Sequence, residues 1–299
     1  MRSISTSSNR EPRTPDGALH KMGEPGNKIV SLTARGPSVR IVQLTDTHLK
    51  GAPGGELLGL DTDYSLQAVL ELVKAEQPDP DLVLGTGDLA DSGAGDAYRR
   101  LIGYFDQVSA EHYWLPGNHD QREVMVDVGG EHRLPGEIRV GQWQIIMLDS
   151  QIPGKVGGNL GATELAHLKA CLNDESAKDL HVLICLHHQP IRVGCEWLDE
   201  QMVSDAPEFF AVIDEHPRVR AVLWGHVHQE LDERRGPMRM LCTPSTCVQF
   251  LPGQEDFAVD TRAPGYRWLE LADDGSIQTG VSRADSQTFH VDREAGGYL

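Results

Sequence analysis

The chain has 299 residues, of which 39% are hydrophobic, and carries a formal net charge of −18 with a sequence pI near 5.0. This length is sufficient for one large core or two small ones. The negative charge opposes binding to a phosphate backbone, and no run of Lys or Arg exceeds two residues. No segment approaches the roughly 20 apolar residues of a membrane span. We therefore expect neither a nucleic acid nor a membrane as partner.

Five cysteines are scattered along the chain without the paired spacing of a thiolate metal site: Cys171, Cys185, Cys195, Cys242 and Cys247. An odd, scattered set is typical of reduced intracellular thiols. The N-terminal region also lacks the apolar stretch of a secretory signal. We therefore expect a cytoplasmic protein.

In chain order, the composition first predicts a disordered tail over residues 1–37, which are rich in Ser, Arg, Pro and Gly. Short apolar runs then predict strands over 39–45, 81–87, 112–116, 143–149, 181–187 and 219–225. Helical spacing predicts helices over 65–77 and 97–108 and near 163–173 and 207–215. The alternation favours an α/β core.

The segment from about residue 238 differs, because it holds strand-like runs at 238–250, 266–273 and 276–283 separated by turns. We expect these runs to form a strand-rich C-terminal cap. The main domain would then span 38–285, and residues 286–299 would form a second tail. "DTDY", at 61–64, fits either a helix N-terminal cap or the rim of a site.

Polar clusters follow five of the predicted strands. They are "TDTH" at 45–48, "GD" at 87–88, "GNHD" at 117–120, "HH" at 187–188 and "GHVH" at 225–228. Ligands of α/β sheets bind outside the carboxyl ends of the strands. Each cluster alone is also an ordinary turn or cap. The set of five favours one shared site.

The clusters offer seven metal-binding side chains: Asp46, His48, Asp88, Asn118, His187, His226 and His228. Nitrogen and oxygen donors without a thiolate suit Mn, Fe, Co or Zn. Seven donors are too many for one tetrahedral ion, whereas two ions about 3.5–4 Å apart that share one carboxylate would use all of them. The sequence therefore predicts a dinuclear metal site.

The order D-x-H, G-D, G-N-H-D, H-H-x-P and G-H-x-H resembles the calcineurin-like metallophosphoesterase superfamily. The sequence is still more similar to the bacterial class III cyclic-AMP phosphodiesterases. The shared segments are "QLTDTHL" (43–49), "TGDLA" (86–90), "LPGNHD" (115–120), "LDSQ" (148–151), "WLD" (197–199), "GHVHQELD" (225–232) and "TPSTCVQF" (243–250). The resemblance covers roughly residues 38 to 285 and implies a four-layer α/β/β/α sandwich.

The resemblance also implies how the seven ligands divide. One metal would take Asp46, His48 and His228, the other Asn118, His187 and His226, and Asp88 would bridge them. Successive strand residues point to opposite faces, so only one of the two adjacent histidines at 187–188 is expected to be a ligand. The family pattern favours His187. His188 would then lie behind the ligands or face the substrate.

The implied reaction is hydrolysis of 3′,5′-cyclic AMP to 5′-AMP, which would lower intracellular cyclic AMP, with a bridging hydroxide as the nucleophile. We expect His119 to protonate the leaving alkoxide and Asp120 to orient His119. The side chains expected to face the substrate are His48, Asn118, His119, His188 and His228. Trp197 and the 243–250 segment are candidates for base contacts, although Trp197 and Phe250 fit ordinary packing equally well.

Two other functions remain compatible with the sequence. One is a phosphodiesterase or phosphomonoesterase of broader specificity. The other is a non-catalytic metal- or nucleotide-binding regulator, which the full set of seven ligands disfavours. Fe and Mn are the expected metals, with Zn and Co as alternatives. The sequence leaves a homodimer open.

Overall fold

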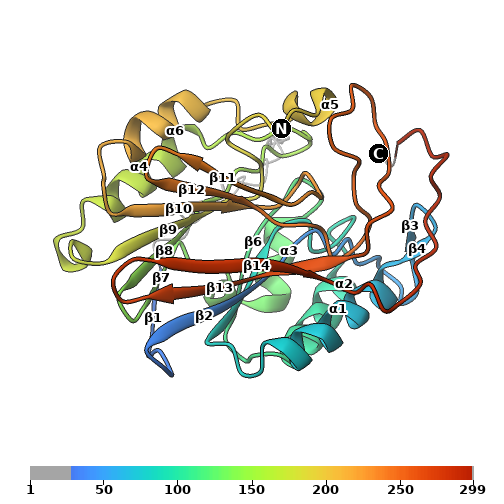
Figure 1. The fold of residues 1–299 in the computed structure, drawn as a ribbon, viewed down its shortest axis with the longest axis horizontal. Coiled ribbons are helices and arrows are strands. Elements are labelled where there is room, and N and C mark those ends of the chain that lie inside the picture. The colour runs from blue at the N-terminus through green and yellow to red at the C-terminus, as the bar shows by residue number, and fades with distance from the viewer. Residues whose placement is uncertain (1–27, 298–299) are drawn as a thin grey trace, which may run out of the picture.

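The structure, a computed structural model, describes residues 28–297 and contains two stacked β-sheets with helices on their outer faces (Figure 1). The strands are β1 (Ile29–Leu32), β2 (Ser38–Leu44), β3 (Glu56–Leu57), β4 (Leu60–Asp61), β5 (Leu82–Thr86), β6 (His112–Leu115), β7 (Glu137–Val140), β8 (Trp143–Met147), β9 (His181–Cys185), β10 (Val219–Trp224), β11 (Leu231–Arg235), β12 (Met238–Cys242), β13 (Gly265–Ala272) and β14 (Ile277–Arg283). The α-helices are α1 (Thr62–Glu76), α2 (Gly95–Phe105), α3 (Arg122–Gly129), α4 (Gly161–Leu172), α5 (Glu196–Asp199) and α6 (Ala206–Ile213).

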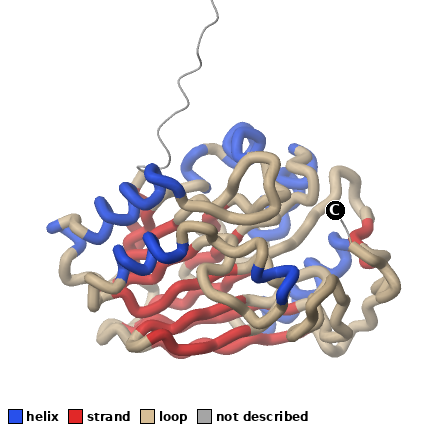
Figure 2. Tube along the Cα trace, turned by 90° about the horizontal axis from the view of Figure 1, so that it is seen from above, coloured by secondary structure: helices blue, strands red, loops and turns tan. Residues whose placement is uncertain are grey.

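The sheet topology brings many strand ends to one side of the molecule. One sheet has the order β1-β7-β8-β9-β10-β12-β11, and the other has the order β14-β13-β2-β5-β6. Strands β2, β5 and β6 run parallel, as do β8, β9, β10 and β12. Loops gather beyond one end of the strands (Figure 2).

Three hydrophobic clusters hold the four layers together. One cluster joins the inner faces of the two sheets, for example through Ile41 and Leu84 from one sheet and Ile145 and Leu223 from the other. A second packs α4 and α6 on the seven-stranded sheet, and a third packs α1, α2 and α3 on the five-stranded sheet. This arrangement confirms the four-layer α/β/β/α sandwich and the predicted order of the main strands and helices.

The N-terminal boundary differs from the expectation of a tail over 1–37. β1 pairs in parallel with β7, with Ile29 opposite Glu137 and Leu32 opposite Val140. Val30 and Leu32 also pack on the cluster between the sheets. The composition of this segment alone indicates disorder. Backbone pairing and the apolar contact instead hold it in a defined position. Residues 1–27 of the expected tail lie outside the described part of the chain.

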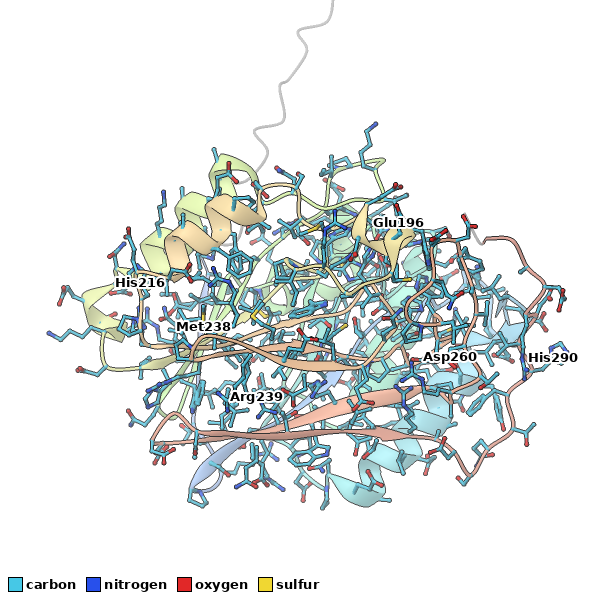
Figure 3. The ribbon with its side chains drawn as sticks, turned by 45° about the horizontal axis from the view of Figure 1, so that its top comes forward. Glu196, His216, Met238, Arg239, Asp260 and His290 are labelled. Carbon is cyan, nitrogen blue, oxygen red and sulfur yellow. The ribbon has the colours of Figure 1, made fainter. Side chains whose placement is uncertain are left out.

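The C-terminal strands complete the two sheets. β12 lies within the seven-stranded sheet, and β13 and β14 form one side of the five-stranded sheet. The segment is strand-rich as expected, although its strands extend the core sheets. After them, residues 286–297 run along the outside, where His290 lies at the far edge (Figure 3). There Asp292 N donates a 2.7 Å hydrogen bond to Leu58 O.

The 61–64 segment is a helix cap. Asp61 precedes α1, and its carboxylate accepts a 2.9 Å hydrogen bond from Tyr64 N. This satisfies one of the unpaired N–H groups of the first turn.

Among the described residues, no helix is long and apolar enough to cross a membrane.

Candidate metal centre

The five polar clusters meet where the carboxyl ends of strands from both sheets converge. β2, β5 and β6 supply three clusters, and β9 and β10 of the other sheet supply two. Main-chain hydrogen bonds connect the loops: His48 N donates to Asp88 O at 2.9 Å, and Gly225 N donates to His187 O at 3.1 Å. The structure therefore brings the predicted clusters together.

The backbone is strained at most of the predicted ligands. Among residues 28–297, seven non-glycine residues have positive φ, and five of them are predicted ligands: Asp46, His48, Asp88, His226 and His228. This region is uncommon for residues that carry a Cβ and costs free energy. The positive φ values therefore coincide with residues whose side chains gather in one small volume.

Asp46, His48 and His228 form a fully buried group. Asp46 Oδ1 lies 3.4 Å from His228 Nε2, and the Nε2 atoms of His48 and His228 are 3.3 Å apart. His228 Nδ1 donates to Val248 O at 2.8 Å, which fixes the tautomer and leaves the Nε2 lone pair available. This geometry suits one cation.

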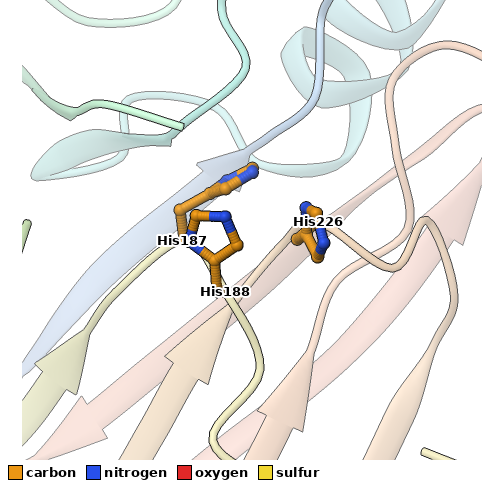
Figure 4. A group of neighbouring side chains, drawn as sticks. All are labelled: His187, His188 and His226. Carbon is orange, nitrogen blue, oxygen red and sulfur yellow. The ribbon is translucent and has the colours of Figure 1, made fainter. Parts of the chain in front are cut away.

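A second group consists of His187, His188 and His226, which lie side by side (Figure 4). His226 Nδ1 and Asn118 Oδ1 are buried and have no hydrogen-bond partner in the described part of the chain. Leaving such polar atoms unpaired costs roughly 1–3 kcal/mol each. Asp88 joins the groups, because Asp88 Oδ2 lies 3.2 Å from His187 Nε2 and 3.8 Å from His48 Nε2. The donor set therefore fits a second cation.

The two adjacent histidines have different surroundings. His187 Nδ1 donates to Thr86 O at 2.8 Å, and its Nε2 points into the site. Both ring nitrogens of His188 are engaged, Nδ1 with Ser150 Oγ at 2.8 Å and Nε2 with Val156 O at 2.9 Å. This difference favours His187 as a ligand and a supporting position for His188.

Nearby histidines favour the ionised form of Asp46 and Asp88. Burial alone would raise the pKa of Asp46, but the charge of His228 and a hydrogen bond with it lower the pKa below its ordinary value. Burial likewise opposes ionisation of Asp88, and the charge of His187 holds the pKa of Asp88 well below its usual range. For His187, burial would lower the pKa, whereas Asp88 raises it to about 9. Two carboxylates that remain ionised at this depth favour a cation bound between them.

Two glycines allow the loops to approach each other. A Cβ at Gly117 would collide with Asp88 and would lie 2.7 Å from His187 Nε2. A Cβ at Gly225 would collide with Thr45 and would lie 2.5 Å from Asp46 Oδ2. The glycines of "GNHD" and "GHVH" are therefore needed for steric reasons beside the ligands.

His119 lies at the exposed side of the site. Its main-chain N–H donates to Asp88 Oδ1 at 2.8 Å, and its ring packs edge-on against His48. Its side chain is 12% exposed, whereas those of Asp88 and His48 are at most 1% exposed. His119 Nδ1 lies 3.1 Å from Asp91 O and 3.9 Å from Asp91 Oδ1.

Asp120 lies behind the site, between two of its loops. Its carboxylate accepts hydrogen bonds of 2.8–3.1 Å from the main-chain N–H groups of Leu89, Ala90 and Gly117 and from the Tyr98 hydroxyl. Burial and the charge of Asp88 raise the pKa of Asp120 to about 6. Asp120 therefore connects the loops after β5 and β6, and its part in orienting His119 stays a prediction.

Asp91 is the carboxylate beside His119, and sequence reasoning missed it. Asp91 Oδ1 also lies 3.6 Å from His48 Nδ1, and Oδ2 accepts a 2.6 Å hydrogen bond from Lys50. Burial would raise the pKa of Asp91, but His48 and Lys50 outweigh it and lower the pKa to about 2. The available signal was an acidic residue three positions after Asp88.

The aromatic residues considered for base contacts are packed together. Phe250 is fully buried and stacks on His228 with 4.2 Å between ring centroids. Trp197 packs edge-on against Phe250 and Phe257. Phe250 therefore packs directly against the ring of His228.

The fold and the two joined clusters define a hydrolase of the two-metal class. The chain belongs to the calcineurin-like phosphoesterase family, whose model matches residues 39–230. Family membership and the His/Asp clusters together support a dinuclear divalent metal centre.

The relatives cover most of the chain. A Pseudomonas aeruginosa protein named 3′,5′-cyclic adenosine monophosphate phosphodiesterase CpdA is 44% identical over 262 residues, which are 87% of this chain and 96% of that protein. The Escherichia coli K12 protein of the same name is 42% identical over 263 residues, covering 87% and 95%. A dimetal phosphatase from Danio rerio is 14% identical with a TM-score of 0.59, covering 83% and 100%, and shows the fold alone.

Proposed function

We propose that this protein hydrolyses 3′,5′-cyclic AMP to 5′-AMP at a dinuclear metal centre. The observation that carries the reaction type is the pair of buried donor groups joined by Asp88. The substrate follows from the names of relatives that are 44% and 42% identical along nearly their whole length.

We assign the ligands according to their contacts. Asp46, His48 and His228 would hold one cation, and Asn118, His187 and His226 would hold the other. Asp88 would contact both cations, which its distances to His48 and His187 support. Iron and manganese are our first choice and zinc and cobalt the alternatives, because all four accept histidine nitrogen together with carboxylate and amide oxygen. When bound, two such cations generate a hydroxide nucleophile from water and stabilise charge on the phosphoryl oxygens.

His119 is the proposed proton donor to the leaving 3′-alkoxide. It lies beside the centre, and its contact with the Asp91 carbonyl occupies Nδ1, so Nε2 is the nitrogen that transfers the proton. Proton donation of this kind contributes about 10²–10⁴-fold to rate. The carboxylate of Asp91, between His119 and His48, would position both rings.

The substrate would lie against the edges of His48, Asn118, His119 and His228. His188 would act behind the ligands, because both of its ring nitrogens already have protein partners. We also propose a cytoplasmic location, which the free, buried state of the five cysteines supports.

Replacement of Asp88 by alanine tests this proposal. Asp88→Ala removes the carboxylate shared by both groups, so we expect loss of bound metal and of cyclic AMP turnover together. Asp96→Ala is the matched control, because Asp96 is 75% exposed and forms an ion pair with Arg99 on the surface of α2. Full activity of the Asp88→Ala protein would refute the assignment. Faster turnover of 2′,3′-cyclic AMP or an aryl diester would favour a broader phosphodiesterase.

A further inference from the structure

One ligand of the proposed centre is oriented by a side chain. His187 and His228 each donate Nδ1–H to a main-chain carbonyl, that of Thr86 and that of Val248, both at 2.8 Å. His226 instead contacts the side chain of Gln201, with 3.0 Å between His226 Nε2 and Gln201 Oε1. Gln201 lies just after α5, outside the five ligand clusters.

The contact determines which nitrogen of His226 can bind a cation. An amide oxygen only accepts hydrogen bonds, so the imidazole proton must be on Nε2. The lone pair then belongs to Nδ1. That atom is buried and has no hydrogen-bond partner among the described residues. It is therefore the ligand atom that Gln201 leaves available, and the contact also fixes the ring angle.

The neighbouring loops hold Gln201 in place. Its main-chain N–H donates to Leu198 O at 2.9 Å, and its carbonyl accepts from Gly158 N at 3.1 Å. At the other end of α5, Glu196 N donates to Gln254 O at 2.9 Å. Glu196 is labelled in Figure 3, above the sheets. The short helix is thus fastened at both ends, which limits the positions that Gln201 can adopt.

We propose that Gln201 is a positioning residue for one of the two metal ions, the ion held by His226. This inference rests on the proposed metal centre and adds to it a residue that touches neither substrate nor metal. Partners of metal-bound histidines typically contribute about 10–100-fold to metal affinity. The loss on substitution should concern one ion only, because the group of Asp46, His48 and His228 does not include His226.

Three variants test the inference by titration of chelator-treated protein with Mn²⁺ in a calorimeter. Gln201→Leu keeps a similar volume but removes the acceptor, so we expect one ion to bind as in wild type and the other about 10–100-fold more weakly. Gln201→Glu keeps an acceptor and should retain the affinity of both ions. Gln107→Leu is the matched control, because the exposed side chain of Gln107 donates to Gly103 O at the end of α2, and it should bind like wild type.

The readout separates positioning from a structural role. Wild-type affinity for both ions in Gln201→Leu would overturn the inference. An equal loss in Gln201→Leu and Gln201→Glu would overturn it as well, since the acceptor would then be irrelevant. A clearly lower melting temperature of metal-free Gln201→Leu would show an effect on folding and also contradict it. If wild-type protein bound no Mn²⁺, the proposed metal centre itself would fail.

Discussion

Gly225→Ala offers a sharp steric test of the metal centre. Gly225 joins β10 to the two histidines of "GHVH", and its φ lies outside the left-handed region, so alanine causes no backbone strain there. The added Cβ would collide with Thr45 Oγ1 and lie 2.5 Å from Asp46 Oδ2. The Thr45 hydroxyl donates to the Asp46 carboxylate at 2.7 Å, so both must move.

The expected loss of metal affinity in Gly225→Ala follows from the crowding around the added Cβ. Forcing one extra methyl group into a packed interior costs about 1–3 kcal/mol. If Asp46 moves away from His226 N, it also weakens two 3.1 Å hydrogen bonds that hold its carboxylate oxygens. At about 1.4 kcal/mol for each tenfold change, we expect metal affinity to fall roughly 5–150-fold.

The assay is a Mn²⁺ titration with a parallel measurement of kcat/KM for cyclic AMP. Gly103→Ala is the control, because Gly103 lies in α2 and an added Cβ meets nothing within 4 Å. That variant should bind metal normally and gain about 0.5–1 kcal/mol of stability, since alanine favours a helix over glycine. Wild-type metal affinity in Gly225→Ala would refute the steric reasoning.

Other residues give further tests. His119→Ala should lower kcat for cyclic AMP by about 10²–10⁴-fold but affect an aryl phosphodiester much less, because an aryl leaving group needs no proton; equal losses on both substrates would exclude the acid role. Asp91→Asn should reduce kcat/KM about 10–100-fold, and unchanged kinetics would show that its carboxylate does not position His119. All five cysteines are buried, and burial raises the pKa of Cys247 to about 12 and also raises the pKa of Cys185, so iodoacetamide at pH 8 should modify the folded protein very slowly; rapid modification before unfolding would contradict this burial.

The parts of the fold that sequence predicted well are those with a local signal. The predicted strand over 219–225 corresponds to β10 at 219–224, and the predicted helix over 97–108 corresponds to α2 at 95–105. Continuous apolar runs and helical spacing are properties of neighbouring residues, so strands and helices with these patterns can be predicted without knowledge of the tertiary structure. β1 lacks such a signal, since it is short and half-exposed and depends on pairing with β7, more than a hundred residues away.

In the candidate site, too, some residues could be predicted from local sequence and others could not. The five clusters were visible because each joins metal-binding side chains to a strand end. The supporting groups were not, because the carbonyls of Thr86 and Val248 that orient two histidines are main-chain atoms, which every residue possesses. Asp91 was missed for a similar reason, since only the folded loops show that its carboxylate lies near the His119 ring.

Cyclic AMP hydrolysis measured against metal content tests the central claim most directly. Chelator-treated protein would be reconstituted with increasing Mn²⁺ or Fe²⁺, and bound metal and 5′-AMP formation would be measured on the same samples. We predict no turnover without metal and a maximum at two ions per chain. Full turnover by metal-free protein, or no cyclic AMP hydrolysis with two ions bound, would contradict the account.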